Sequence, residues 1–208
     1  MNPAELALTP DPSARSLLPA APARSLHPPG DLAIWVFILA ELLAFGVFFA
    51  TYAITRMHNV ELFDEMQLTL DRRAGAINTF LLITASWCVA RGVAAIKLDR
   101  VKASARWQLL GIAAGFGFVA VKVFEYHGKL SAGINLATNT FYMFYLSLTF
   151  FHFMHVLLGL AILLAVWRKT AVGGYSSADH HGMETGASYW HMVDLVWVVL
   201  FPLVYVMR

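Results

Sequence analysis

Charged residues are scarce in this chain of 208 residues. Asp, Glu, Lys and Arg make up 13% of it, whereas 59% of the residues are hydrophobic. Ordinary soluble domains contain about twice that share of charged residues. The net charge is only +2 and no run of Lys and Arg exceeds two residues, which excludes the dense basic surface typical of nucleic-acid-binding proteins. The composition therefore predicts a membrane protein.

Cysteine and proline are also scarce. The single cysteine, Cys88, lies in an apolar segment, which excludes a disulfide framework and a paired-thiolate metal centre such as a dinuclear copper site. Seven of the eight prolines fall within residues 1–31. Because that segment has no continuous apolar stretch typical of a signal peptide, we expect it to be a flexible Pro/Ala-rich tail.

Long apolar segments recur five times after residue 31. Each is long enough, as a helix, to cross a hydrocarbon layer of ~30 Å, which takes about 20 residues. Unpaired backbone groups are prohibitive in lipid, and the segments lack the alternating pattern of barrel strands. We therefore predict an all-α polytopic membrane bundle over residues 32–208, with five transmembrane helices at about 32–55, 76–97, 106–126, 139–167 and 187–207.

The flanking residues predict an orientation for this bundle. With a cytoplasmic N-terminus, the tail and loops place eight Lys and Arg residues on the cytoplasmic side and five on the other side. Trp35, Trp107, Trp167 and Trp190 fall near the cytoplasmic ends of the same spans, where indole rings anchor helices at the interface. Both patterns favour a cytoplasmic N-terminus and a periplasmic C-terminus.

Two carboxyl groups lie inside the first and third spans, where a charge is costly. Glu41 is nine residues into its span, so we expect it to face protein. Two roles remain open for it: a proton-linked or partner-contacting carboxyl, or a neutral hydrogen-bonded group that fixes packing. Lys122 and Glu125 are three residues apart, a spacing at which an ion pair offsets the cost of both charges.

Histidines within the spans occur only in the last two. His152 and His155 share a helix face at a spacing that can bind a metal, but no Glu or Cys one turn away completes a ligand set, so we predict no metal site. His191 and Asp194 are also three residues apart. We expect this pair on the inner side of the bundle, hydrogen-bonded to neighbouring helices, although proton transfer remains an alternative.

Four segments together resemble a known family. In order and spacing, they are similar to the helices of subunit III of the haem-copper oxidases: "WVFILAELLAFGVFF", "INTFLLITASWCVARGV", "YLSLTFFHFMHVLLGL" and "ETGASYWHMVDLVWVVLFPLVY". The motifs H-x-x-H-V-x-x-G and Y-W-H-x-V-D-x-x-W carry most of the resemblance. The count of five spans and the ending "VLFPLVYVMR" look most like the NorE-type protein associated with nitric oxide reductase.

The resemblance implies a non-catalytic accessory subunit in a bacterial inner membrane. Such a subunit holds phospholipid, has no haem or metal of its own, and packs beside a large haem-bearing catalytic subunit whose assembly, stability or proton uptake it supports. For the NorE-type branch the complex is the nitric oxide reductase of denitrification; the alternative is an aerobic cytochrome c or quinol oxidase of the respiratory electron-transport chain. By position, the family's recurrent polar residues correspond to Glu41, Glu125, His155, Glu184, Trp190, His191 and Asp194.

The residues themselves agree with the lack of a redox centre. A catalytic haem-copper chain needs histidines on several helices to ligate two haems and a copper ion, whereas this chain has them in two spans only. Two other classes of protein remain open. An independent proton-linked transporter would use Glu41, the histidines and Asp194, although the spans lack the broken helices or internal repeat of many transporters. An intramembrane enzyme would require a metal on His152 and His155.

Overall fold

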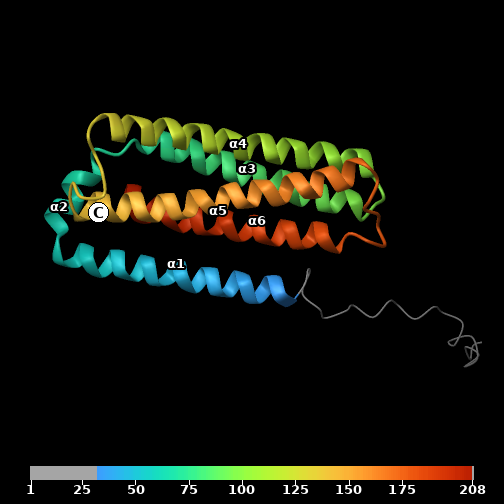
Figure 1. Cartoon of the computed structure of the whole chain (residues 1–208), viewed down its shortest axis with the longest axis horizontal. Coiled ribbons are helices and arrows are strands. Elements are labelled where there is room, and N and C mark those ends of the chain that lie inside the picture. The colour runs from blue at the N-terminus through green and yellow to red at the C-terminus, as the bar shows by residue number, and fades with distance from the viewer. Residues whose placement is uncertain (1–31, 208) are drawn as a thin grey trace, which may run out of the picture.

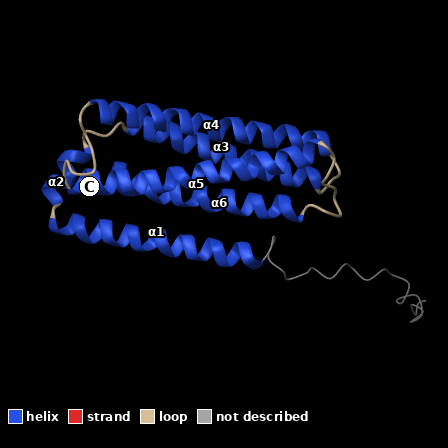
Figure 2. Cartoon of the chain, in the orientation of Figure 1, coloured by secondary structure: helices blue, strands red, loops and turns tan. Residues whose placement is uncertain are grey.

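The structure is a computed structural model that describes residues 32–207, and it is all-helical over that range (Figures 1 and 2). The five helices α1, α3, α4, α5 and α6 are long and apolar enough to cross a membrane. The predicted all-α bundle of five membrane helices is thus confirmed, while the predicted tail, residues 1–31, lies outside the described residues. The helices are α1 (Leu32–His58), α2 (Val60–Gln67), α3 (Arg72–Ile96), α4 (Val101–Ser131), α5 (Thr140–Ala171), α6 (His181–Phe201) and the π-helical turn η2 (Pro202–Val206).

Helices α3 to α6 form a closed four-helix bundle, in which α3 contacts α4 and α6, and α5 contacts the same two helices. Helix α1 lies along the outside of this bundle and contacts α6 (Figure 1). Helix α2, the loop 132–139 and the C-terminus gather at one end, which we call the α2 end. The loops 97–100 and 172–180 lie at the opposite end, which we call the loop end.

Short polar motifs determine where the membrane helices begin and end. The side chains of Asp71 and Asn139 cap α3 and α5 by accepting hydrogen bonds from backbone N–H groups of the first turn, which otherwise have no partner. Two residues after the last residue of α4 and of α5 come Gly133 and Gly173, both with a φ of 76°, the left-handed conformation that closes a helix most easily with glycine. Asp99 takes the same role after α3, with a φ of 53°.

The ends of the molecule hold two features that the sequence analysis did not predict. Helix α2 lies within a segment that is polar overall, but its Phe63 is only 1% exposed, and its acidic residues follow the opposite face of a 3.6-residue period. At the C-terminus, Pro202 has no N–H to donate to the preceding turn. The helix widens there, and the Met207 N–H donates to the Pro202 carbonyl at 2.8 Å.

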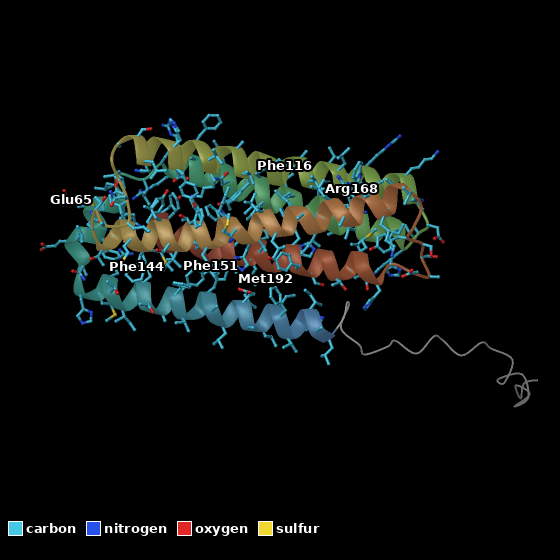
Figure 3. The ribbon with its side chains drawn as sticks, in the orientation of Figure 1. Glu65, Phe116, Phe144, Phe151, Arg168 and Met192 are labelled. Atoms are coloured by element: carbon cyan, nitrogen blue, oxygen red, sulfur yellow. The ribbon has the colours of Figure 1, made fainter. Side chains whose placement is uncertain are left out.

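Aromatic side chains fill the space between α1 and the bundle. Phe144 and Phe151 of α5 lie between α5 and α1 (Figure 3). The ring of Phe151 is 5.1 Å from that of Phe45, and the ring of Phe144 is 5.9 Å from that of Tyr52, centroid to centroid. These contacts fix α1 against α5 with its polar residue, Glu41, on the packed side.

Candidate functional site

Glu41 and His155 form an ion pair or hydrogen bond between α1 and α5. The Glu41 Oε2 atom lies 3.0 Å from His155 Nε2, and the other ring nitrogen, Nδ1, lies 2.8 Å from the Phe151 carbonyl oxygen. The two side chains are 20% and 11% exposed. The carboxyl therefore faces protein but keeps an accessible edge at the boundary between α1 and the bundle.

His152, one turn before His155, has a different environment. Its ring is fully buried and is packed among Phe45, Phe118 and Trp197. Neither ring nitrogen has a hydrogen-bond partner among residues 32–207. The two histidines of the H-x-x-H motif thus do not converge on one ligand, and the described residues contain no group of three His, Cys, Asp or Glu side chains arranged to hold a metal ion.

Lys122 and Glu125 form the ion pair that their spacing predicts. The Lys122 Nζ atom donates to Glu125 Oε2 at 2.9 Å and to the Tyr205 hydroxyl at 2.8 Å. The second carboxylate oxygen, Oε1, accepts from the hydroxyls of Tyr145 and Tyr205 at 2.7 and 2.8 Å. The lysine is fully buried and the carboxylate 5% exposed, so this cluster joins α4, α5 and the π-helical turn through hydrogen bonds inside the bundle.

An aromatic cage surrounds the Lys122 ammonium. Nζ lies between 5.2 and 5.6 Å from four ring centroids, distances at which a cation is attracted to the face of each ring. Together with the two hydrogen bonds, the cage offsets the cost of burying the charge. The rings are those of Tyr126, Tyr145, Trp197 and Tyr205.

His191 and Asp194 lie at the boundary between α6 and α3. The Nδ1 atom of His191 is 2.5 Å from the Ser86 hydroxyl of α3. The predicted hydrogen bond to a neighbouring helix is therefore present for His191. The predicted inner position is wrong for His191, which is exposed, whereas Asp194 is half-buried. The reason is rotation: Val193, Val196 and Trp197 occupy the inner face of α6 and turn His191 outward.

Glu184 lies in the first turn of α6, at the loop end. It accepts from Lys97 at 2.7 Å and is 3.4 Å from His180 Nε2. Half of the Lys97 side chain is exposed. Glu184 thus lies at the end of a membrane helix beside a basic residue, and its place at the head-group level of the cytoplasmic side stays a prediction.

Trp190 is not an interface anchor, contrary to the prediction. Its side chain is fully buried between α4 and α5, where glycines leave room for the ring. A Cβ added at Gly115 would come within 2.9 Å of the Trp190 ring, and one added at Gly159 within 2.9 Å as well. Position along the chain suggested an interface, but the two glycines create an interior slot. The other three predicted anchors, Trp35, Trp107 and Trp167, are half-buried.

A buried polar cluster near the loop end was missed by the sequence analysis. Gln108 of α4 donates to Ser104 and to Thr170 of α5 at 3.0 and 3.1 Å. All three residues are at most 2% exposed. Uncharged polar residues inside an apolar span give only a weak sequence signal. Here the available signal was the i,i+4 spacing of Ser104 and Gln108 on α4.

Comparison with known proteins places these features in a family. The sequence model of the family "Cytochrome c oxidase subunit III" matches residues 29–208. The chain is 35% identical to cytochrome c oxidase subunit 3 of Thermostichus vulcanus over 85% of its own length and 86% of that protein. It is equally similar, at 35%, to the same subunit of Synechocystis sp., over 83% of this chain and 73% of that protein.

A more distant relative is the probable quinol oxidase subunit 3 of Staphylococcus saprophyticus, 26% identical over 84% of this chain and 87% of that protein. The NorE-type assignment finds no support in these relatives, which are named as oxidase subunits. The resemblance predicted from the helix motifs extends over all five membrane helices. The chain belongs to the cytochrome c oxidase subunit III family.

Proposed function

We propose that this chain is the non-catalytic subunit III of an oxygen-reducing haem-copper oxidase in a bacterial inner membrane, of the branch that oxidises cytochrome c. The observation that carries the proposal is the 35% identity to cytochrome c oxidase subunit 3 over nearly the whole of both chains. Quinol oxidase relatives such as that of Staphylococcus saprophyticus are 26% identical. This difference favours cytochrome c over quinol as the electron donor, and the description of both relatives as oxidase subunits favours the oxidase alternative over the NorE-type assignment.

The described polar residues support an accessory role. The Lys122 cluster has its hydrogen-bond partners within the chain, as in a group that holds helices together. The Glu41 and His155 pair is less enclosed and joins the outlying helix to the bundle. We therefore assign to Lys122 and Glu125 a structural role, and to Glu41 and His155 the support of proton uptake or sustained turnover in the neighbouring catalytic subunit.

The first test is purification of the tagged full-length chain from its native membrane in a mild detergent. An optical spectrum and identification of the accompanying proteins follow. We expect a haem spectrum, a large catalytic subunit, and oxygen consumption driven by reduced cytochrome c. Nitric oxide reduction by the complex would reinstate the NorE-type assignment. A colourless chain purified alone would overturn the accessory role and favour an independent transporter.

The role of Glu41 is tested in the same complex with Glu41→Ala. Because the carboxyl contacts His155 and keeps an accessible edge, we expect the subunit to fold and assemble while oxidase activity declines faster during turnover. The matched control is Thr51→Val, since Thr51 lies on the same helix and, among residues 32–207, its hydroxyl bonds only the Val47 carbonyl, at 2.8 Å. Equal rates of activity loss in both variants and in the unmodified complex would contradict the assignment.

A further inference from the structure

The outward faces of the membrane helices are not equivalent. Along α4, every exposed position from 109 to 124 is apolar, as expected of a surface that faces lipid. These positions are Leu109, Leu110, Ala113, Phe116, Ala120, Val123 and Phe124. The α4 face therefore supplies the reference for a lipid-facing surface in this protein.

The boundary between α3 and α6 has a different character. A groove of about 230 Å³ runs along it, and we call it the α3/α6 groove. Three of its residues can carry a charge, and the others are small or apolar. Its lining includes Ala90 and Val93 of α3, Lys97 directly after α3, and Glu184, Ser188 and His191 of α6.

Polar residues of α6 beside the groove continue deep into the membrane. At a rise of 1.5 Å per residue, His191 and Asp194 lie about 15 and 20 Å along α6 from its first residue, so Asp194 is near the middle of the apolar layer. His191 is exposed there and lines the groove, whereas Asp194 Oδ1 lies buried behind it with no hydrogen-bond partner among residues 32–207. Polar groups at such a depth cost several kcal/mol unless a neighbour supplies a hydrogen-bond partner.

We propose that the α3/α6 groove is the docking site of one transmembrane helix of the catalytic subunit. The proposal rests on the proposed function, because it names the surface through which the accessory subunit binds its partner. The Nδ1 atom of His191 already contacts Ser86, which leaves Nε2 for a polar residue of the incoming helix. Small residues at Ala90 and Ser188 allow that helix to approach closely, and the Lys97 and Glu184 ion pair borders the groove at the loop end.

Two other occupants fit less well. A lipid tail offers no hydrogen bond to His191, and a lipid head group would stay near the membrane surface, about 15 Å or more from the deep polar residues. A second copy of the chain would place groove against groove around a two-fold axis. Two grooves placed face to face would leave their combined volume unfilled, whereas side chains from one neighbouring helix are enough to fill a single groove of about 230 Å³.

Site-specific photo-crosslinking in the native membrane identifies the occupant. A photoreactive residue replaces Ser188 in the groove or, as the matched control, Ala120 on the lipid-facing side of α4. We expect Ser188 to give an adduct with the catalytic subunit and Ala120 to give lipid adducts only. An adduct from Ser188 to lipid or to a second copy of this chain, or an adduct from Ala120 to the catalytic subunit, would overturn the proposal.

A pair of substitutions tests whether the groove is needed for binding. Ala90→Trp fills the groove, while Ala113→Trp adds the same ring to the exposed face of α4. Both alanines are exposed, so neither substitution overfills the core. We expect Ala90→Trp to reduce co-purified haem at least about tenfold, which corresponds to ~1.4 kcal/mol of lost binding free energy, and Ala113→Trp to have no effect.

The outcomes separate the two proposals. If the unmodified chain binds no haem-bearing partner, the proposed function fails. If it does bind one, but Ala90→Trp retains the full amount of haem, only the docking site is refuted. Equal thermal stability of the two tryptophan variants in detergent shows that a loss of haem in one of them reflects binding rather than folding.

Discussion

The buried ion pair between Lys122 and Glu125 allows a quantitative test of what holds the bundle together. Lys122→Met removes the ammonium that donates to Glu125 and Tyr205 at 2.9 and 2.8 Å. The carboxylate then keeps only its two tyrosine donors in a site where it is 5% exposed. Breaking one partner of a buried pair costs about 3–5 kcal/mol, a large part of the ~5–15 kcal/mol that stabilises a typical folded domain.

The same reasoning sets the expected results for the other variants. Glu125→Gln leaves the fully buried ammonium without a counter-charge and should cost a similar amount. The double variant, Lys122→Met with Glu125→Gln, removes both charges, and such replacements are often close to neutral. We therefore expect the double variant to be more stable than either single variant, with a coupling free energy of about 2 kcal/mol or more.

The assay is thermal unfolding of the full chain in detergent, monitored by tryptophan fluorescence. Trp197 reports on the site because its ring centroid lies 5.2 Å from Lys122 Nζ. For a protein of this size each kcal/mol shifts Tm by roughly 2–4 °C, so each single variant should lose about 6–20 °C. Lys97→Met is the control, because the Lys97 side chain is half exposed and such pairs contribute about 0–1 kcal/mol. A Tm for Lys122→Met no lower than that of Lys97→Met would refute the reasoning.

Two further predictions concern packing and a loop. Gly159→Ala should lower the free energy of unfolding by about 1–3 kcal/mol, because the new Cβ would come 2.9 Å from the Trp190 ring. Gly46→Ala, where a Cβ meets no atom of the described residues within 4 Å, should be neutral or stabilising in the same thermal assay. At the loop end, hydrogen bonds from the Ser177 hydroxyl and backbone N–H lower the pKa of Asp99. The contact is therefore fully formed above the ordinary carboxyl pKa and is lost as pH falls through the lowered value in the folded chain. Hydrogen exchange at the Ser177 amide, corrected for the intrinsic effect of pH, should show this acid loosening in the unmodified chain and not in Asp99→Asn; the same response in both would contradict it.

The sequence alone determined the class of fold, the number of membrane helices and the family. A continuous apolar run of more than 20 residues crosses lipid as a helix, because a helix pairs its backbone N–H and C=O groups within the same segment. The Lys122 and Glu125 pair was also predictable, since both residues lie on one helix at a spacing that brings them together. The polar ends of the helices and the amphipathic helix α2 were not evident, because the membrane signal stops where the residues become polar.

Only the tertiary structure decided which polar groups meet across helices. Glu41 and His155 are 114 residues apart in the chain, and Lys122 and Tyr205 are 83 apart, so no local pattern relates them. The rotation of each helix about its axis is set by packing against its neighbours. That rotation buried Trp190 in a slot between two glycines and turned His191 outward, because in a helix that is apolar on most sides the sequence does not say which side faces the core.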